Sequence, residues 1–193
     1  MIKQKKVGSI LNKFIPQGST IGIIGGGQLG QMMALDAKQT GMKVIILDPT
    51  PNCPAGQVAD EQIVAPYADT KAIEKLADKA DVLTYEFENV DLNALEDVQD
   101  RVYLPQGTNL LYTTKNRLRE KNFLRQAGVK TAPFMAVHTS AELKDAVKKI
   151  GYPAVLKTSE GGYDGHGQEV LRNKDDLDKC APILATGDCI LEG

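Results

Sequence analysis

Short apolar runs alternate with amphipathic stretches along the first half of the chain. The runs at residues 21–24 and 44–47 are typical of buried strands, and residues 29–39 between them predict a helix. Further strands are predicted at residues 63–64, 81–85 and 102–104, and a second helix at residues 70–79. Strands that alternate with helices of this length favour a parallel sheet with helices on both faces. We therefore expect the first half to form a Rossmann-like α/β domain.

Both predicted helices are amphipathic. At helical spacing, the second helix packs Ile73 and Leu76. The first helix ends at Gly41, which is a common stop residue. One face of this first helix is expected to carry four apolar residues: Leu29, Met32, Met33 and Ala37.

The pattern changes after Pro105. A charged amphipathic helix is predicted at residues 113–126. Beyond it the sequence predicts strands at residues 132–137, 155–157, 168–171 and 189–192, and helices at residues 141–150, after a Ser140 cap, and 175–180. We divide the chain into an extension at residues 1–19, with a short helix near residues 10–14, and domains at residues 20–112 and 113–193. The last strand opens with nothing to close it, so we expect the front part of a longer protein.

The composition limits the class of protein. The chain has 193 residues, 42% of them apolar and 25% charged, which suits one large or two small domains. A formal net charge of −2 offers no basic field for nucleic acid. We recognise no apolar run of bilayer length and no signal peptide. Cys53, Cys180 and Cys189 lack the paired spacing of a disulfide framework or a zinc site. We expect a cytoplasmic, soluble, reduced protein with no membrane or nucleic-acid partner.

A glycine-rich loop at residues 161–168 is the most informative functional signal. Its sequence, Gly-Gly-Tyr-Asp-Gly-His-Gly-Gln, follows an apolar run that ends in Lys157. Glycines are costly to order, so such a loop favours a ligand that approaches the backbone closely. Consecutive N–H groups can wrap a phosphate, and Lys157 would add a point charge to it. The alternative is an ordinary hairpin turn of unusual glycine content.

A second glycine turn follows the first predicted strand. Gly25-x-Gly27-x-x-Gly30 has the form of a dinucleotide-binding turn, and Asp48 stands where nicotinamide-dependent oxidoreductases have their ribose-binding acid. The same turn suits any phosphate or carboxylate at a helix N-terminus, or a connection that binds nothing. An NAD-dependent oxidoreductase is therefore one hypothesis, but it leaves the loop at residues 161–168 unexplained.

Charged residues at three further places are candidates. Glu86 and Glu88 follow a predicted strand at the end where open α/β sheets bind ligands, although exposed acids at a helix start are the alternative. Arg117 lies among other basic residues on a charged helix, and periodicity does not select which of them reaches a phosphate. His166 is expected near phosphate because it lies in the loop, and His138 is expected to be incidental.

Together these segments resemble one family. Residues 23–32, 47–49 and 84–90 are similar to the N-terminal domain of the N5-carboxyaminoimidazole ribonucleotide synthetases, ATP-grasp ligases of bacterial and fungal purine biosynthesis. Residues 116–121 and 161–168 extend the resemblance into the ATP-grasp domain, and the string Gly-Gly-Tyr-Asp-Gly-x-Gly-Gln is its most specific part. The resemblance implies an α/β fold class: a Rossmann-like parallel-sheet N-terminal domain followed by the first part of an ATP-grasp domain.

The resemblance also implies a reaction and a site. ATP and bicarbonate would form carboxyphosphate, whose carboxyl group passes to the exocyclic amine of 5-aminoimidazole ribonucleotide, with Mg²⁺ as the metal and a homodimer as the assembly. The implied substrate-binding residues are Gly27, Gln28, Leu29 and Glu86. The implied ATP-binding residues are Arg117, Lys157, Gly162, Tyr163, Asp164, Gly165, His166, Gly167, Gln168 and Glu192.

Two departures from the family pattern accompany this resemblance. The family usually has a basic residue where His166 stands, and in part an Asp-Arg pair where Asn116-Arg117 stands. Its magnesium ligands lie beyond Gly193, so no metal ligand and no catalytic residue is assigned here. The chain by itself is therefore expected to be inactive. Two alternatives to this carboxylating ligase stay open. One is another ATP-grasp ligase with a different amine or carboxylate substrate, and the other is a nucleotide-binding module without turnover.

Overall fold

The computed structural model describes residues 14–162 and 166–193. The chain divides into two compact units, Met1–Leu110 and Leu111–Gly193. Each unit has its own sheet and its own cluster of buried apolar residues. The helix predicted near residues 10–14 lies almost wholly outside the described residues.

The first unit contains a parallel sheet. Its strands are β1 (Thr20–Ile24), β2 (Lys43–Asp48), β3 (Glu61–Val64) and β4 (Val82–Tyr85), in the order β3-β2-β1-β4. All three neighbouring pairs are parallel, and Ile23 faces Ile46 on one side and Thr84 on the other. The predicted parallel sheet is confirmed. Of the strand predicted at residues 102–104, only Tyr103 pairs with the sheet, in an isolated bridge to Val82.

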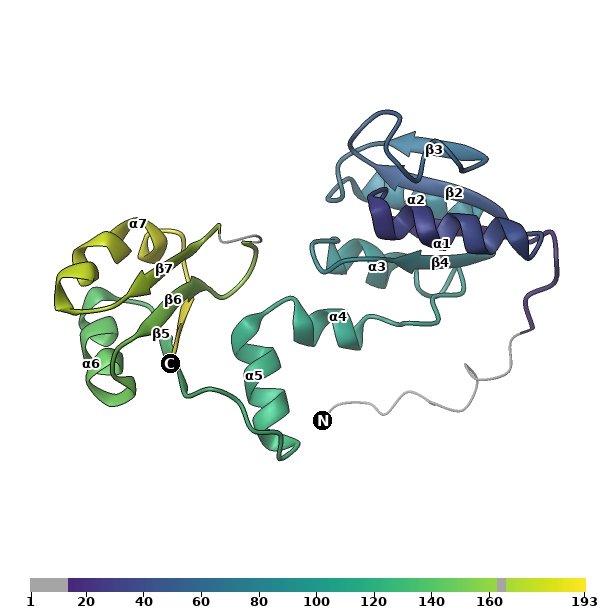
Figure 1. The fold of residues 1–193 in the computed structure, drawn as a ribbon. Coiled ribbons are helices and arrows are strands. Elements are labelled where there is room, and N and C mark those ends of the chain that lie inside the picture. Colours follow the sequence, from purple (N-terminus) through teal and green to yellow (C-terminus); the bar gives the residue numbers. More distant parts are fainter. Residues whose placement is uncertain (1–13, 163–165) are drawn as a thin grey trace. The chain divides into compact units, whose positions relative to one another are not determined.

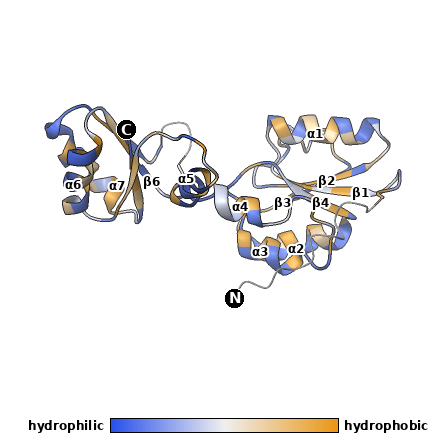
Figure 2. Cartoon of the chain, turned by 90° about the horizontal axis from the view of Figure 1, so that it is seen from below, coloured by the Kyte–Doolittle hydropathy of each residue, from blue (hydrophilic) through white to orange (hydrophobic). Residues whose placement is uncertain are grey.

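Helices cover both faces of this sheet, as predicted. Helix α1 (Gln28–Gln39) lies on one face, and α2 (Thr70–Lys79) and α3 (Leu92–Val98) lie on the other (Figures 1 and 2). Helix α2 has the predicted bounds and buries Ile73 and Leu76. Helix α3 was not predicted, because seven residues form only two turns and give a weak periodic signal.

The packing of α1 differs from the prediction. Ala37 is buried together with Gly30 and Ala34, whereas three of the predicted apolar residues are exposed: Leu29, Met32 and Met33. A Cβ at Gly30 would lie 2.3 Å from the carbonyl oxygen of Gly25, so the helix lies very close to the glycine turn. Close approach admits only small side chains, and this requirement decides which side of α1 is buried.

The helix predicted at residues 113–126 is two helices in the structure. Helix α4 (Asn109–Thr114) precedes Asn116, and α5 (Arg117–Gln126) follows it. The Asn116 side chain accepts hydrogen bonds from the backbone N–H groups of Leu118 and Arg119. Asparagine in this position caps a new helix, so the prediction of one continuous helix is wrong.

The remaining helices follow the prediction with small differences. They are α6 (Ser140–Ile150), the 3₁₀-helix η2 (Lys174–Cys180) and α7 (Ala181–Leu184), of which α7 was not predicted. Helix α6 is capped by Thr139 rather than by the predicted Ser140, since Thr139 Oγ1 accepts a hydrogen bond from the Glu142 N–H at 3.1 Å.

The sheet of the second unit is antiparallel. Its strands are β5 (Phe134–Val137), β6 (Ala154–Thr158), β7 (Gln168–Leu171) and β8 (Cys189–Glu192), in the order β5-β8-β6-β7 (Figure 1). Strands β7 and β8 have the predicted bounds. One face of the sheet packs with α6 and η2 into the core: Val137, Leu143, Ala146, Val147, Ala154, Leu156, Leu171, Cys180, Cys189 and Leu191. Alternate strand residues point to the opposite face.

Candidate functional site

Lys157 and Glu192 form an ion pair on the sheet face opposite the core. In the β6–β8 register Val155 faces Glu192 and Lys157 faces Ile190, so Lys157 and Glu192 project from the same face. Lys157 Nζ lies 2.7 Å from Glu192 Oε2, and Lys121 Nζ of α5 lies 3.3 Å from Glu192 Oε1. The structure therefore brings together two of the predicted ATP-binding residues, with a third charge that sequence reasoning did not select.

The two lysines determine the charge of Glu192. Its side chain is largely buried, and burial alone would raise the pKa of the carboxyl group. The hydrogen bond and charge of Lys157, assisted by Lys121, outweigh burial and hold this pKa below its ordinary value. Glu192 is therefore a carboxylate at neutral pH, and it offers a hydrogen-bond acceptor beside two ammonium groups.

The glycine loop starts and ends at fixed positions. The Thr158 N–H donates a hydrogen bond to the Gly167 carbonyl at 3.0 Å, which closes the base of the loop. Gly162 has φ +73°, and a Cβ there would lie 2.5 Å from the His166 carbonyl oxygen. Only glycine fits this left-handed position, whatever the loop binds. Of the other predicted loop residues, Tyr163, Asp164 and Gly165 lie outside the described residues.

Arg117 contacts the first half of the loop. Its backbone N–H donates to the Ser159 carbonyl at 2.8 Å. Its guanidinium donates to the Thr158 and Gly161 carbonyls at 2.9 and 2.6 Å, and to the Gly162 carbonyl at 2.9 Å. The side chain that the family resemblance assigns to ATP is therefore directed at the loop backbone in this structure, and it ties α5 to the loop.

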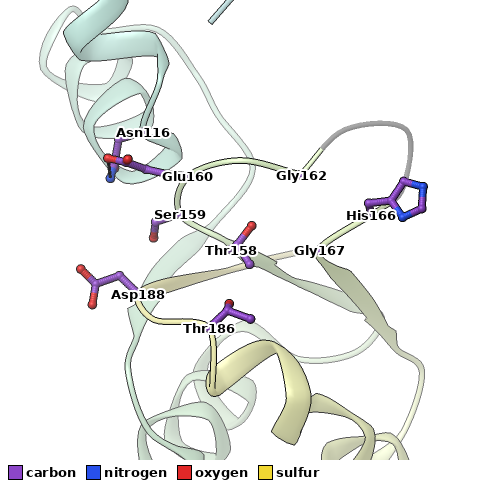
Figure 3. Close-up of a pocket in the computed structure, with 9 residues that line it drawn as sticks. All are labelled: Asn116, Thr158, Ser159, Glu160, Gly162, His166, Gly167, Thr186 and Asp188. Carbon is purple, nitrogen blue, oxygen red and sulfur yellow. Dashed lines mark hydrogen bonds between the residues drawn. The ribbon is translucent and has the colours of Figure 1, made fainter. Parts of the chain in front are cut away.

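A cavity of about 540 Å³ lies beside the loop (Figure 3). Of the predicted ATP-binding residues, Gly162, His166 and Gly167 line it, together with Asn116, Thr158, Ser159, Glu160, Thr186 and Asp188. Ser159 is 2% exposed, and within the described ranges its Oγ has no hydrogen-bond partner. Of the predicted ATP-binding residues that the structure describes, three thus line this cavity and two form the Lys157–Glu192 pair. Arg117 contacts the loop carbonyls, and Gln168 lies opposite Lys157 in the β6–β7 register.

In the first unit, the glycine turn meets Glu86. Because β1 and β4 are parallel neighbours, the turn after β1 and the residue after β4 lie at the same end of the sheet. Gly25 has φ +112°, and a Cβ there would lie 2.3 Å from Glu86 Cγ. Gly27 is the N-cap of α1 and contributes no side-chain cap, which leaves the first N–H groups of the helix open to a ligand. Gly27 and Glu86 therefore lie close together, since a Cβ on Gly27 would be 3.6 Å from Glu86 Oε1. Gln28 and Leu29 follow Gly27 as the first two residues of α1.

Asp48 lies at the end of β2, as predicted, but its carboxylate is used inside the unit. The residue is 5% exposed. Its Oδ2 accepts hydrogen bonds from the Gly26 N–H at 2.8 Å and from the Tyr67 hydroxyl at 2.5 Å, and its Oδ1 accepts one from the Thr50 N–H at 2.8 Å. The carboxylate therefore holds the glycine turn. The oxidoreductase hypothesis requires it to face a ribose instead, and it does not.

Comparisons with known proteins match both parts of the chain. The profile of the ribonucleotide synthetase preATP-grasp domain matches residues 18–113, and that of the ATP-grasp domain matches residues 122–193. The N5-carboxyaminoimidazole ribonucleotide synthase of Bacillus subtilis is 52% identical over 180 residues, which cover 93% of this chain and 47% of that protein. The chain belongs to the N5-carboxyaminoimidazole ribonucleotide synthase family.

Solved structures of this synthase family share the fold. The Staphylococcus aureus N5-carboxyaminoimidazole synthetase complexed with ADP has a TM-score of 0.91 and 42% identity, over 95% of this chain and 49% of that one. The Aspergillus clavatus synthase in complex with ADP and 5-aminoimidazole ribonucleotide has a TM-score of 0.79 and 30% identity, over 91% and 46%. The predicted fold class is confirmed. The chain spans about half the length of the curated relatives it matches.

The synthase family implies a metal, but the described residues do not form a site for one. Within residues 14–162 and 166–193, no three His, Cys, Asp or Glu side chains gather in a group that could hold a metal ion.

Over the same ranges, no helix has the length and hydrophobicity needed to cross a membrane. Cys53, Cys180 and Cys189 are free and buried.

Sequence reasoning missed several residues around the cavity of this synthase family member. Ser159, Glu160 and Asp188 follow or precede strands and belong to no motif, so no sequence pattern selects them. His138, expected to be incidental, has its Nδ1 2.9 Å from Asp188 Oδ1. Asn116 did carry a signal, because an asparagine before a helical stretch is a preferred N-cap.

Proposed function

We propose that the complete protein is an ATP-dependent ligase that carboxylates 5-aminoimidazole ribonucleotide with bicarbonate. Bicarbonate oxygen attacks the γ-phosphorus of ATP, which gives carboxyphosphate and ADP. The exocyclic amine then attacks the carboxyl carbon, phosphate leaves, and the amine loses a proton, giving N5-carboxyaminoimidazole ribonucleotide. The observation that carries the proposal is the 52% identity to the Bacillus subtilis synthase across 93% of the chain.

We assign ATP to the second unit. The loop residues Gly162 to Gln168 would direct backbone N–H groups at the β- and γ-phosphates. Lys157 would supply positive charge beside these phosphates. Glu192 would accept a hydrogen bond from the adenine end of ATP. Arg117 would act at the same phosphates or, as its contacts with the loop carbonyls favour, through the loop backbone. Supporting this assignment, relatives from Staphylococcus aureus and Aspergillus clavatus were solved with ADP.

We assign the ribonucleotide to the end of the first sheet, at Gly27, Gln28, Leu29 and Glu86. Burial raises the pKa of Glu86, and the negative charges of Asp48 and Glu88 raise it further. A substrate amino or hydroxyl group that donates a hydrogen bond would offset this unfavourable charge. The Aspergillus clavatus relative was solved with 5-aminoimidazole ribonucleotide, which is the substrate that the proposal requires.

We further propose that the protein works as a cytoplasmic homodimer with Mg²⁺ accompanying ATP. Free, buried thiols at all three cysteines suit a reducing compartment. The magnesium ligands are expected beyond Gly193, and residues 14–162 and 166–193 hold no group of three His, Cys, Asp or Glu side chains that could bind a metal ion. The protein residues named above bind and orient the reactants and exclude water from the acyl phosphate.

The experiment measures ADP release from Mg-ATP and bicarbonate, with and without 5-aminoimidazole ribonucleotide, using protein from the complete reading frame. Release that depends on the ribonucleotide is expected. Lys157→Met should abolish most of it, whereas Lys148→Met, an exposed lysine on α6, should not. Release that is absent, or indifferent to the ribonucleotide, would contradict the assigned substrate and leave another ATP-grasp ligase. The 193-residue chain alone should show no turnover.

A further inference from the structure

Glu160, the residue before the glycine loop, is bound by the start of α5. Its Oε1 accepts hydrogen bonds from Asn116 Nδ2 at 3.0 Å and from Arg119 Nη2 at 2.6 Å. The backbones of Asn116 and Glu160 also form an isolated antiparallel bridge. Figure 3 shows the two side chains next to each other at the end of the helix. A side chain without any motif of its own thus has a defined place beside the loop.

The partners of Glu160 are themselves fixed. Asn116 Oδ1 caps α5, so one end of this side chain holds the helix while its amide nitrogen holds Glu160. The Arg119 guanidinium stacks on the Tyr112 ring, with Cζ 3.9 Å from the ring centroid. Together with the bonds from Arg117 to the loop carbonyls, the first turn of α5 holds the backbone from Thr158 to Gly162.

These contacts contribute more to position than to stability. The Arg119 and Glu160 side chains are 29% and 47% exposed, and ion pairs this accessible to water contribute little to folding. The loop that follows depends on the direction of its N–H groups, since glycines supply no side chain that could correct a misplaced backbone. A small displacement of the loop start would turn those groups away from a bound phosphate.

We propose that Glu160 is a positioning residue, which acts through Asn116 and Arg119 to set the start of the glycine loop for ATP. The inference rests on the proposed function only in that ATP is the ligand of the loop. In this role Glu160 acts on the loop backbone and not on a reactant. Its carboxylate orients the backbone whose N–H groups make the contact.

The contacts allow a rescue experiment in the complete protein. Asn116→Asp keeps the helix cap, because Asp and Asn cap equally well, but it places a second carboxylate against Glu160. Glu160→Gln restores a hydrogen-bond donor opposite Asp at position 116, so the double variant should recover the parent's affinity for ATP. Asp145→Asn is the matched control, since it removes an exposed ion pair with Lys148 on α6.

We expect Asn116→Asp to raise the KM for ATP, and the Kd for ATP measured by calorimetry, about fivefold. Without ATP the start of the loop can move away from position 116, whereas ATP binding would hold two like charges in contact near water. The double variant should lie within about twofold of the parent, with the KM for the ribonucleotide and the melting temperature unchanged throughout. Asp145→Asn should match the parent.

An Asn116→Asp variant with the parent's ATP affinity would overturn the proposal. So would a double variant that does not recover, or a loss of affinity that appears only with a lower melting temperature. If the parent shows no ribonucleotide-dependent turnover, the proposed reaction fails, but the ATP affinities still decide the role of Glu160.

Discussion

Replacement of Asp48 by asparagine tests whether a buried carboxylate holds the first glycine turn. In the structure each carboxylate oxygen accepts a backbone N–H at 2.8 Å, one from Gly26 and one from Thr50. Asparagine has a single amide oxygen, so one of these N–H groups must face another donor. The site is 5% exposed, and water therefore cannot replace the lost acceptor.

The magnitude follows from these two contacts. A hydrogen bond to a charged group contributes roughly 1.5–3 kcal/mol, and a buried donor left unpaired costs about 1–3 kcal/mol. Because the two effects overlap, we expect Asp48→Asn to lower the free energy of unfolding of the first unit by about 3 kcal/mol. For a unit of this size, that lowers the melting temperature by roughly 12–24 °C.

Urea unfolding followed by circular dichroism measures the loss, and hydrogen exchange locates it at the Gly26 and Thr50 amides. Asp36→Asn makes the same charge change on the exposed side of α1 and should stay within about 0.5 kcal/mol of the parent. Tyr67→Phe removes only the hydroxyl donor and should cost about 1–2 kcal/mol. The reasoning is refuted if Asp48→Asn unfolds at the same urea concentration as Asp36→Asn.

Three further predictions concern Glu86, Glu192 and Gly162. The pKa of Glu86 is raised in the folded state, so its contribution to stability is present at low pH and is lost as the pH rises. In urea unfolding, Glu86→Gln should therefore be more stable than the parent at pH 7 and as stable as the parent at about pH 4. The pKa of Glu192 is lowered, so its contribution to stability is present above the ordinary pKa of a glutamate and is lost as the pH falls. The free energy of unfolding of Glu192→Gln should be roughly 1–2 kcal/mol below that of the parent at neutral pH, and this difference should narrow below about pH 4. Gly162→Ala puts a Cβ in the left-handed region at a cost of about 1–2 kcal/mol and should weaken ATP binding in the complete protein, as calorimetry would show; unchanged ATP affinity would contradict the assignment of this loop.

The sequence by itself determined the elements whose burial is periodic and local. Continuous apolar runs located β1, β2 and β4, and amphipathic spacing located α2 with its correct bounds. The loop at residues 161–168 stood out because its glycines have no local explanation. Patterns of this kind repeat within a few residues, so a single sequence contains them.

Only the tertiary structure decided which groups meet across long separations. The glycine turn against α1 requires Gly30 on the buried side of the helix, where Ala34 also lies, although larger apolar residues lie nearby. Asp48 became an internal acceptor because Gly26, 22 positions away, is placed beside it by the pairing of β1 with β2. Glu160 accepts a hydrogen bond from Asn116, 44 positions away, because the start of α5 lies beside the glycine loop. Such contacts depend on how strands and helices pack, and packing leaves no periodic trace in the sequence around either partner.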